Sequence, residues 1–180
     1  AAYHRKGNYA EALKNNLIAL EIREKIGDKK DIAVSYNNIG LIYENQGVYS
    51  EARKNHDKAL KLRIEINDKS GMASSYNNIG NLYAQLGNYS EALSNYLLTL
   101  KLDEELGDKS GIASDYMNIG IIYDYQGNYS EALKKYFAAL KINQEIGAPY
   151  LVAASSLNIG KVYFIENNYP MATNYFLQAL

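Results

Sequence analysis

The sequence contains no cysteine, which excludes disulfide bonds, thiol catalysis and cysteine-ligated zinc. Its 19 basic and 20 acidic residues nearly cancel, and a net charge of −1 gives no electrostatic footprint for nucleic acid. No apolar run approaches the roughly 20 residues that a helix needs to span a bilayer. No phosphate-binding glycine loop, dinucleotide fingerprint or nucleophile–base pair is found. We therefore expect no nucleic-acid partner, no membrane span in this sequence, no metal, no cofactor and no catalytic residue.

One stretch, by contrast, recurs four times along the chain. Its copies read SYNNIGLIYENQGVY (35–49), SYNNIGNLYAQLGNY (75–89), DYMNIGIIYDYQGNY (115–129) and, more loosely, SSLNIGKVYFIENNY (155–169). The glycine of each NIG triplet marks a constant step of 40 residues: Gly40, Gly80, Gly120 and Gly160. A fixed period of this length is the signature of a solenoid built from stacked repeats.

The step divides the chain into repeats, which we expect to form a single array over residues 1–180. These are a partial repeat (1–28), three full repeats (29–68, 69–108 and 109–148) and a truncated repeat (149–180). Ala1 aligns with Leu41 inside a repeat, and Leu180 aligns with Leu140 inside a predicted helix. We therefore expect the sequence to be a fragment of a longer protein.

Each full repeat is predicted to form two helices. The first follows an aspartate suited to capping free backbone N–H groups: Asp28, Asp68 and Asp108. The second begins near a serine: Ser50, Ser90 and Ser130. The last repeat places Pro149 and Pro170 at these two starts, where proline is tolerated. Glycine or asparagine ends each helix, and the short connections make neighbouring helices antiparallel. The prediction is an all-α fold with nine helical segments.

The two helices of a repeat carry matching faces. In the second repeat Tyr36, Ile39, Gly40 and Tyr43 share one side of the first helix. The matching stripe of the second helix is Ala52, His56, Ala59 and Leu60. Small residues beside aromatic ones at this spacing suit closely packed helices.

These residues together resemble the tetratricopeptide repeat. The second repeat carries the motif at Tyr36, Ile39, Gly40, Tyr43, Gly47, Tyr49, Ala52, His56 and Ala59. The step of 40 residues exceeds the usual value of about 34. This long form is similar to the repeats of kinesin light chain, Pins-like polarity adaptors, Rap-type bacterial receptors and the sensor arrays of bacterial signalling enzymes. The resemblance implies a right-handed α-solenoid, a superhelix of antiparallel helix pairs whose first helices line a concave groove for peptides or partner proteins.

An asparagine recurs at one position of every predicted first helix: Asn38, Asn78, Asn118 and Asn158. Asparagine is unfavourable in a helix interior, so its recurrence needs a reason. The resemblance to kinesin light chain implies a row of amides in the groove, each able to donate to and accept from the backbone of an extended ligand. The alternative is that each amide bonds to the adjacent repeat and orders the stack, and the two roles are compatible.

The other predicted groove residues change character along the chain. The second and third repeats contribute polar side chains: Asn37, Glu44, Asn45, Asn77, Asn81 and Gln85. The fourth and fifth contribute mostly apolar ones: Met117, Ile121, Tyr125, Leu157, Phe164 and Ile165. Exposed apolar patches often mark interaction sites, but Phe164 and Ile165 also fit packing against a further repeat. Lys161 is the groove's one basic residue, which disfavours recognition of an acidic C-terminal tail.

Two further features have simple structural interpretations. The sequence has two histidines, His4 and His56, and His56 falls in an aromatic core position, which favours a packed residue over a ligand. The acidic run 103–105 is expected to be solvated.

We interpret the chain as a peptide- or protein-binding scaffold within a larger protein, with signalling as one context. The alternative function is a spacer or self-association module in which the end repeats stack to form a homo-oligomer.

Overall fold

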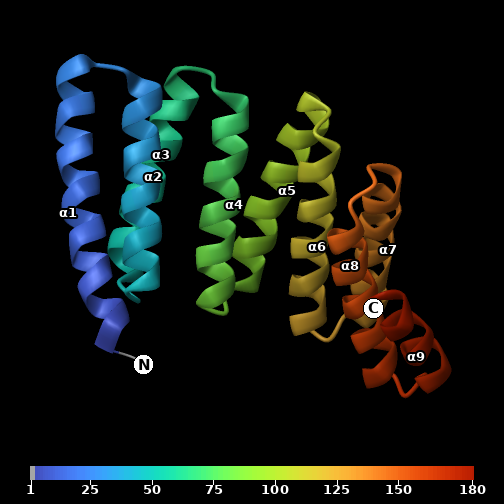
Figure 1. Cartoon of the computed structure of the whole chain (residues 1–180). Coiled ribbons are helices and arrows are strands. Elements are labelled where there is room, and N and C mark those ends of the chain that lie inside the picture. Colours follow the sequence, from blue (N-terminus) through green and yellow to red (C-terminus); the bar gives the residue numbers. More distant parts are fainter. Residues whose placement is uncertain (1–2) are drawn as a thin grey trace. The chain divides into compact units, whose positions relative to one another are not determined.

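The protein is all-helical over the part that the structure describes. The computed structural model describes residues 3–180, with side chains from Tyr9 onward, so the side chain of His4 lies outside the described residues. Over this range the chain forms nine helices and no strand (Figure 1). Their bounds are α1 (Tyr3–Ile26), α2 (Lys29–Asn45), α3 (Tyr49–Glu65), α4 (Lys69–Gln85), α5 (Tyr89–Leu106), α6 (Lys109–Tyr125), α7 (Tyr129–Glu145), α8 (Pro149–Ile165) and α9 (Tyr169–Gln178). The prediction of nine helical segments is confirmed.

The helices divide into two compact units, residues 1–86 and 87–180. In the first unit α2 pairs with α3, while α1 packs on α2 and α4 packs on α3. In the second unit α6 pairs with α7 and α8 with α9, while α5 packs on α6 and α7 on α8. Each unit therefore stacks helix pairs in chain order, as a repeat array requires.

The helix starts follow the predicted capping residues. The Asp28 carboxylate accepts from the backbone N–H groups of Lys30 and Asp31 at 2.9 and 3.2 Å. Asp68 and Asp108 each accept from the N–H three residues further on, both at 3.0 Å. Pro149 is the first residue of α8, as predicted. The second helices begin at a tyrosine, one residue before the predicted serines.

Left-handed residues end the helices, as predicted. Asn67 and Asn167, which replace glycine in two repeats, have φ values of 53° and 60°. Asparagine is among the residues that tolerate this region best after glycine. The 40-residue pattern of glycine and asparagine therefore sets where each helix stops.

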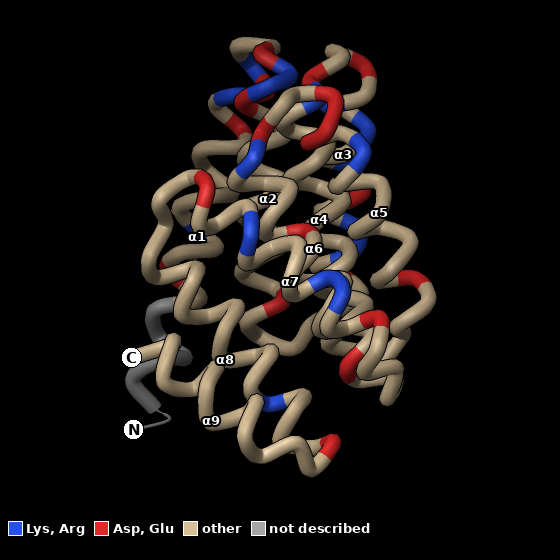
Figure 2. The backbone as a smooth tube through the Cα atoms, turned by 90° about the vertical axis from the view of Figure 1, so that its right-hand side faces the viewer, with Lys and Arg blue, Asp and Glu red and all other residues tan. Residues whose placement is uncertain are grey.

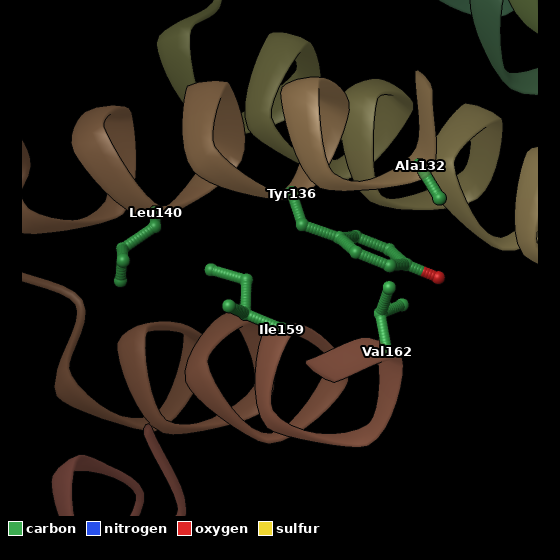
Figure 3. Close-up of a cluster of buried hydrophobic side chains, with 5 residues drawn as sticks. All are labelled: Ala132, Tyr136, Leu140, Ile159 and Val162. Carbon is green, nitrogen blue, oxygen red and sulfur yellow. The ribbon is translucent and has the colours of Figure 1, made fainter. Parts of the chain in front are cut away.

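In the second, fourth and fifth repeats a glycine of the first helix meets a ring of the second helix in the core. A Cβ added to Gly40 would lie 2.7 Å from the His56 imidazole, and one added to Gly120 would lie 2.6 Å from the Tyr136 ring. In the second unit Tyr136 also packs with Ala132 and Leu140 of α7 against Ile159 and Val162 of α8 (Figure 3). The NIG glycine is therefore a close-packing residue. Asn38, two residues before Gly40, is exposed on the side away from the core.

Candidate binding surface on the first helices

In the first unit, the predicted groove residues of α2 and α4 form a polar surface. Asn38 is exposed, and Asn37, Asn77, Asn78 and Asn81 are half-buried. The Asn78 side-chain N–H donates to the Asn37 side-chain oxygen at 2.7 Å, which links the third repeat to the second. For Asn78 the stacking interpretation therefore applies at least in part. The bond uses one of the two N–H groups of the Asn78 amide.

A second polar link runs parallel to the first. Gln85 of α4 donates through its side-chain N–H to the Glu44 carboxylate of α2. Asn45 donates to the Leu41 carbonyl of its own helix at 2.8 Å. These polar side chains are thus held in place by hydrogen bonds to one another or to the backbone, which lowers the entropy cost of presenting them to a ligand.

His56 lies below this surface and is fully buried, so the hypothesis of a packed histidine is confirmed. Its Nε2 atom is 3.6 Å from a Glu44 carboxylate oxygen, beyond hydrogen-bonding distance. Neither ring nitrogen has a hydrogen-bond partner among the described residues. The histidine therefore acts as a ring that fills the space beside Gly40.

In the second unit the corresponding surface of α6 is largely apolar. Tyr125 is exposed and stacks on Tyr89 with ring centroids 5.6 Å apart. Met117 and Ile121 are half-buried and pack against the core shared by α7 and α8, and the Ser155 hydroxyl donates to the Met117 sulfur at 3.4 Å. Part of the predicted apolar groove is therefore occupied in holding the repeats together.

The amides and the single basic residue of this surface are accessible to different degrees. Asn118 and Asn158 are half-buried, and Lys161 is exposed. Burial raises the pKa of the Asp124 carboxyl, and the positive charge of Lys161 opposes that shift. Lys161 therefore acts on a neighbouring acidic residue of this unit.

The helices α8 and α9 carry very little charge, as Figure 2 shows. Lys161 and Glu166 are the charged residues between positions 149 and 180. Phe164 and Ile165 are exposed, and the Phe164 ring meets Tyr169 edge-on at 5.7 Å. A cavity of about 560 Å³ opens on the end face of this helix pair, lined by Tyr150, Ala153, Leu157, Phe176, Leu177 and Leu180 among others. The second unit therefore presents two apolar areas, one on its first helices and one on its end.

The sequence reasoning missed a set of polar junctions between consecutive repeats. Each joins a residue near the end of a second helix to a small polar residue of the next first helix. Arg23 donates to the Ser35 hydroxyl at 2.6 Å, and Arg63 donates to the Ser75 hydroxyl at 2.8 Å. Asn143 donates to the Ser155 hydroxyl at 3.2 Å. The signal in the sequence was a pair of polar residues 12 positions apart, recurring every 40.

The Arg63 junction shows how such a contact is satisfied. The guanidinium also donates to the Gly71 carbonyl at 2.7 Å, and it is buried beside the N-terminal turn of α4. Burial lowers the pKa of Arg63, while the Asp68 carboxylate opposes the shift. The arginine thus donates hydrogen bonds to a buried hydroxyl and to a carbonyl of the first turn of α4.

The described residues contain neither a metal-binding cluster nor a membrane-spanning helix. No group of three or more His, Asp and Glu side chains in residues 9–180 is arranged to hold a metal ion. Across the same residues, none of the helices combines the length and the apolar character needed to cross a membrane.

The stacked helix pairs, their 40-residue step and their glycine–ring contacts define a helical repeat protein. The family profile of the tetratricopeptide repeat matches residues 1–65, 31–105, 71–145 and 112–180, and so spans the whole chain. The chain belongs to the tetratricopeptide repeat family, a family of protein-interaction repeats. A comparison with curated proteins found no significant match.

Solved structures with the same fold include three that cover nearly the whole chain. BtubC (BKLC) from P. vanneervenii has a TM-score of 0.88 and 22% identity, over 98% of this chain and 73% of BtubC. The apo form of RapI has a TM-score of 0.85 and 21% identity, over 98% of this chain and 49% of RapI. A putative kinesin light chain from Podosopora anserina has a TM-score of 0.77 and 14% identity, over 99% of this chain and 88% of that chain. The predicted fold class, an α-solenoid of antiparallel helix pairs, is confirmed.

Proposed function

We propose that the chain is a binding scaffold that takes up an extended peptide or a segment of a partner protein along its first helices. The observation that carries this proposal is the asparagine that recurs in α2, α4, α6 and α8, exposed or half-buried in each. The proposal includes a single array over residues 1–180 that serves a larger protein, with signalling as one context. It is supported by a structural neighbour described as a Rap protein complexed with competence and sporulation factor, with a TM-score of 0.82.

The chemistry of the surface favours a ligand with an accessible backbone. A carboxamide can donate two hydrogen bonds and accept two, which matches the alternating N–H and C=O groups of an extended chain. The bond from Asn78 to Asn37 fixes the orientation of one amide and leaves it further donor and acceptor capacity. Apolar side chains of the ligand would lie against Ile121 and Tyr125 in the second unit.

Peptide selection against the intact chain tests this proposal. A random peptide library displayed on phage is selected on the wild-type protein, and the best peptide is synthesised as the probe. We expect the variant N38A/N158A to lose about ten-fold in affinity for it, because two amide hydrogen bonds contribute about 1–3 kcal/mol together. The exposed Ser94 of α5 provides the control substitution S94A.

Thermal melting of the same variants separates binding from stacking. Asn38 is exposed, so N38A/N158A is expected to melt within about 2 °C of the wild type, helped by the better helix propensity of alanine. N78A removes the bond to Asn37 and is expected to melt at a lower temperature. If N38A/N158A melts several degrees lower and binds the probe as tightly as the wild type, the asparagines order the stack and the groove interpretation is wrong.

The end face of the second unit supports a second candidate function, self-association between copies. Leu177 is 65% exposed on the wall of the 560 Å³ cavity, and one repeat earlier the corresponding face of α7 is covered by α8. Helical arrays need polar end repeats to stay monomeric, and this face is apolar. We propose that two copies meet through it.

Light scattering over a concentration series measures this association. The wild-type mass is expected to rise toward that of a dimer, and L177E is expected to remain monomeric because it places a charge in the contact. The matched control is I64E, which changes a side chain that is 51% exposed in the first unit. A wild-type protein that stays monomeric at every concentration contradicts self-association.

A further inference from the structure

The junction between α5 and α6 differs in chemistry from the other three junctions. Elsewhere a donor, Arg23, Arg63 or Asn143, meets a serine hydroxyl. Here Asp103 stands at the donor position and Asp115 at the serine position. Two carboxyl groups have no donor between them unless one carries a proton.

Both acids are buried, and they contact each other directly. Asp103 is 8% exposed and Asp115 is 2% exposed, so the prediction of a solvated acidic run is wrong for Asp103, while Glu104 and Glu105 are exposed. The Asp115 and Asp103 carboxyl groups are hydrogen-bonded to each other. The second carboxyl oxygen of Asp115 is buried and has no hydrogen-bond partner among the described residues. The helices approach closely because the residue beside the Asp103 carboxyl is Gly111.

The charged groups that act on the pair are all acidic. Glu104 lies on α5 next to Asp103, and Asp108 caps the start of α6, where its carboxylate accepts from the Gly111 N–H. The nearby lysines are engaged elsewhere. Lys109 at the start of α6 pairs with Glu145 of α7 at 3.3 Å, and Lys135 of α7 lies over the Tyr116 ring. Among the side chains of residues 9–180, the charges that act on the two carboxyl groups come from acidic residues and from no lysine or arginine.

Elementary electrostatics then requires one shared proton. Two carboxylates in hydrogen-bond contact inside a protein repel each other strongly, and one of them retains its proton to a higher pH. Burial and then the neighbouring Asp103 charge raise the pKa of Asp115 to about 8. Burial also raises the pKa of Asp103. While Asp115 keeps its proton, its O–H donates to the Asp103 carboxylate.

We propose that Asp103 and Asp115 form a proton-dependent latch between the third and fourth repeats. With one proton between them, the hydrogen bond holds α5 against α6. When that proton is lost at alkaline pH, two adjacent negative charges push the helices apart. The junction is thus a point at which pH changes the stability of the stacking of consecutive repeats in the second unit.

The direction of the pH effect follows from proton linkage. The folded chain keeps this proton up to a pH of about 8, whereas an aspartate in the unfolded chain loses it near a pH of about 4. Between these values the folded state binds more protons than the unfolded state, so stability falls as pH rises. Above both pKa values the contribution of the pair is constant.

The chain itself supplies the matched control, since D103N/D115S copies the Asn143–Ser155 junction. Melting temperatures of both proteins are measured from pH 5 to 9, and the variant serves as the baseline for all other groups. We expect the wild-type melting temperature to fall relative to the variant by about 3 °C per pH unit up to pH 8. If the melting temperatures of the wild type and the variant change with pH in parallel, the proposal is overturned.

A carbon-13 NMR titration of the aspartate carboxyl groups reads the proton directly in the wild-type protein. One carboxyl of the pair is expected to titrate near a pH of about 8, and in D103N the titration of Asp115 is expected to move to lower pH. Titration of both carboxyl groups near a pH of about 4 would overturn the proposal.

A second melting experiment adds calcium or magnesium chloride at pH 8.5. A rise in melting temperature specific to the wild type would overturn the proposal as well, because the pair would then bind a cation in place of the proton.

Discussion

Replacing Tyr136 by alanine is expected to destabilise the second unit by about 3–5 kcal/mol, the largest loss that we predict for a single substitution. The side chain is 1% exposed and fills the space between Gly120 of its own repeat and Ile159 and Val162 of the next. Figure 3 shows its ring directed between the two helices toward Val162. Alanine would leave a cavity at this point, and the glycine opposite has no side chain with which to fill it.

The measurement is thermal and urea unfolding, with hydrogen exchange to locate the change. The melting temperature is expected to fall by about 10 °C, with protection lost in α6, α7 and α8. Y136H copies His56, the ring that packs beside Gly40 in the second repeat, and is expected to lose much less. Y150A, at a tyrosine that is 83% exposed, is the surface control. A loss in Y136A no greater than in Y150A would contradict the role assigned to this ring.

Much of this architecture was predictable because the same sequence signals recur in phase from one repeat to the next. A single aspartate before a helical pattern is weak evidence for a cap, but Asp28, Asp68 and Asp108 recur in phase and all cap helices in the structure. Asn67 and Asn167 were likewise predicted to end helices in place of glycine, and both have the positive φ that this position requires. At these positions the local preference of the residue and the 40-residue period predict the same helix boundary, and such agreement makes the prediction reliable.

Burial along the first helices was harder to predict. Met117 and Ile121 lie on the predicted groove face and are still half-buried against the next helix pair. A helical period assigns a residue to a face, but the width of that face covered by the neighbour depends on how closely the helices approach. Here that approach depends on the side chains that α7 and α8 contribute together to one core, so it involves two consecutive repeats.

The polar junctions were missed for a different reason. Arg63 and Asp103 lie near the ends of their helices, where charged residues usually face solvent, and the sequence marks their burial only by a polar pair 12 positions apart that recurs every 40 residues. Their partners are 12 residues away on the next helix, across a helix end and a turn. A pairing at that distance follows from the antiparallel geometry and not from a local pattern.

Replacing Arg63 by alanine is the second change with a large expected effect, a loss of about 3 kcal/mol in the first unit. The guanidinium is 6% exposed and is the donor to the Ser75 hydroxyl and the Gly71 carbonyl. Ser75 is fully buried, so its hydroxyl cannot turn to water when the arginine is removed. Leaving such groups without a partner costs more than the bond itself contributed.

Two further variants separate lost hydrogen bonds from lost packing. R63N copies the Asn143 junction, in which a shorter amide donates to Ser155 at 3.2 Å and to the Leu151 carbonyl at 3.4 Å, and it is expected to recover part of the loss. R63M keeps most of the side-chain volume but removes the donor, and S75A then removes one of the unpaired acceptors. We expect R63M/S75A to be more stable than the sum of the two single losses implies, by about 1 kcal/mol in a double-mutant cycle. If R63M is as stable as the wild type and the two substitutions are strictly additive, Arg63 stabilises the unit by packing of its aliphatic stem. Its hydrogen bonds to Ser75 and Gly71 would then contribute nothing.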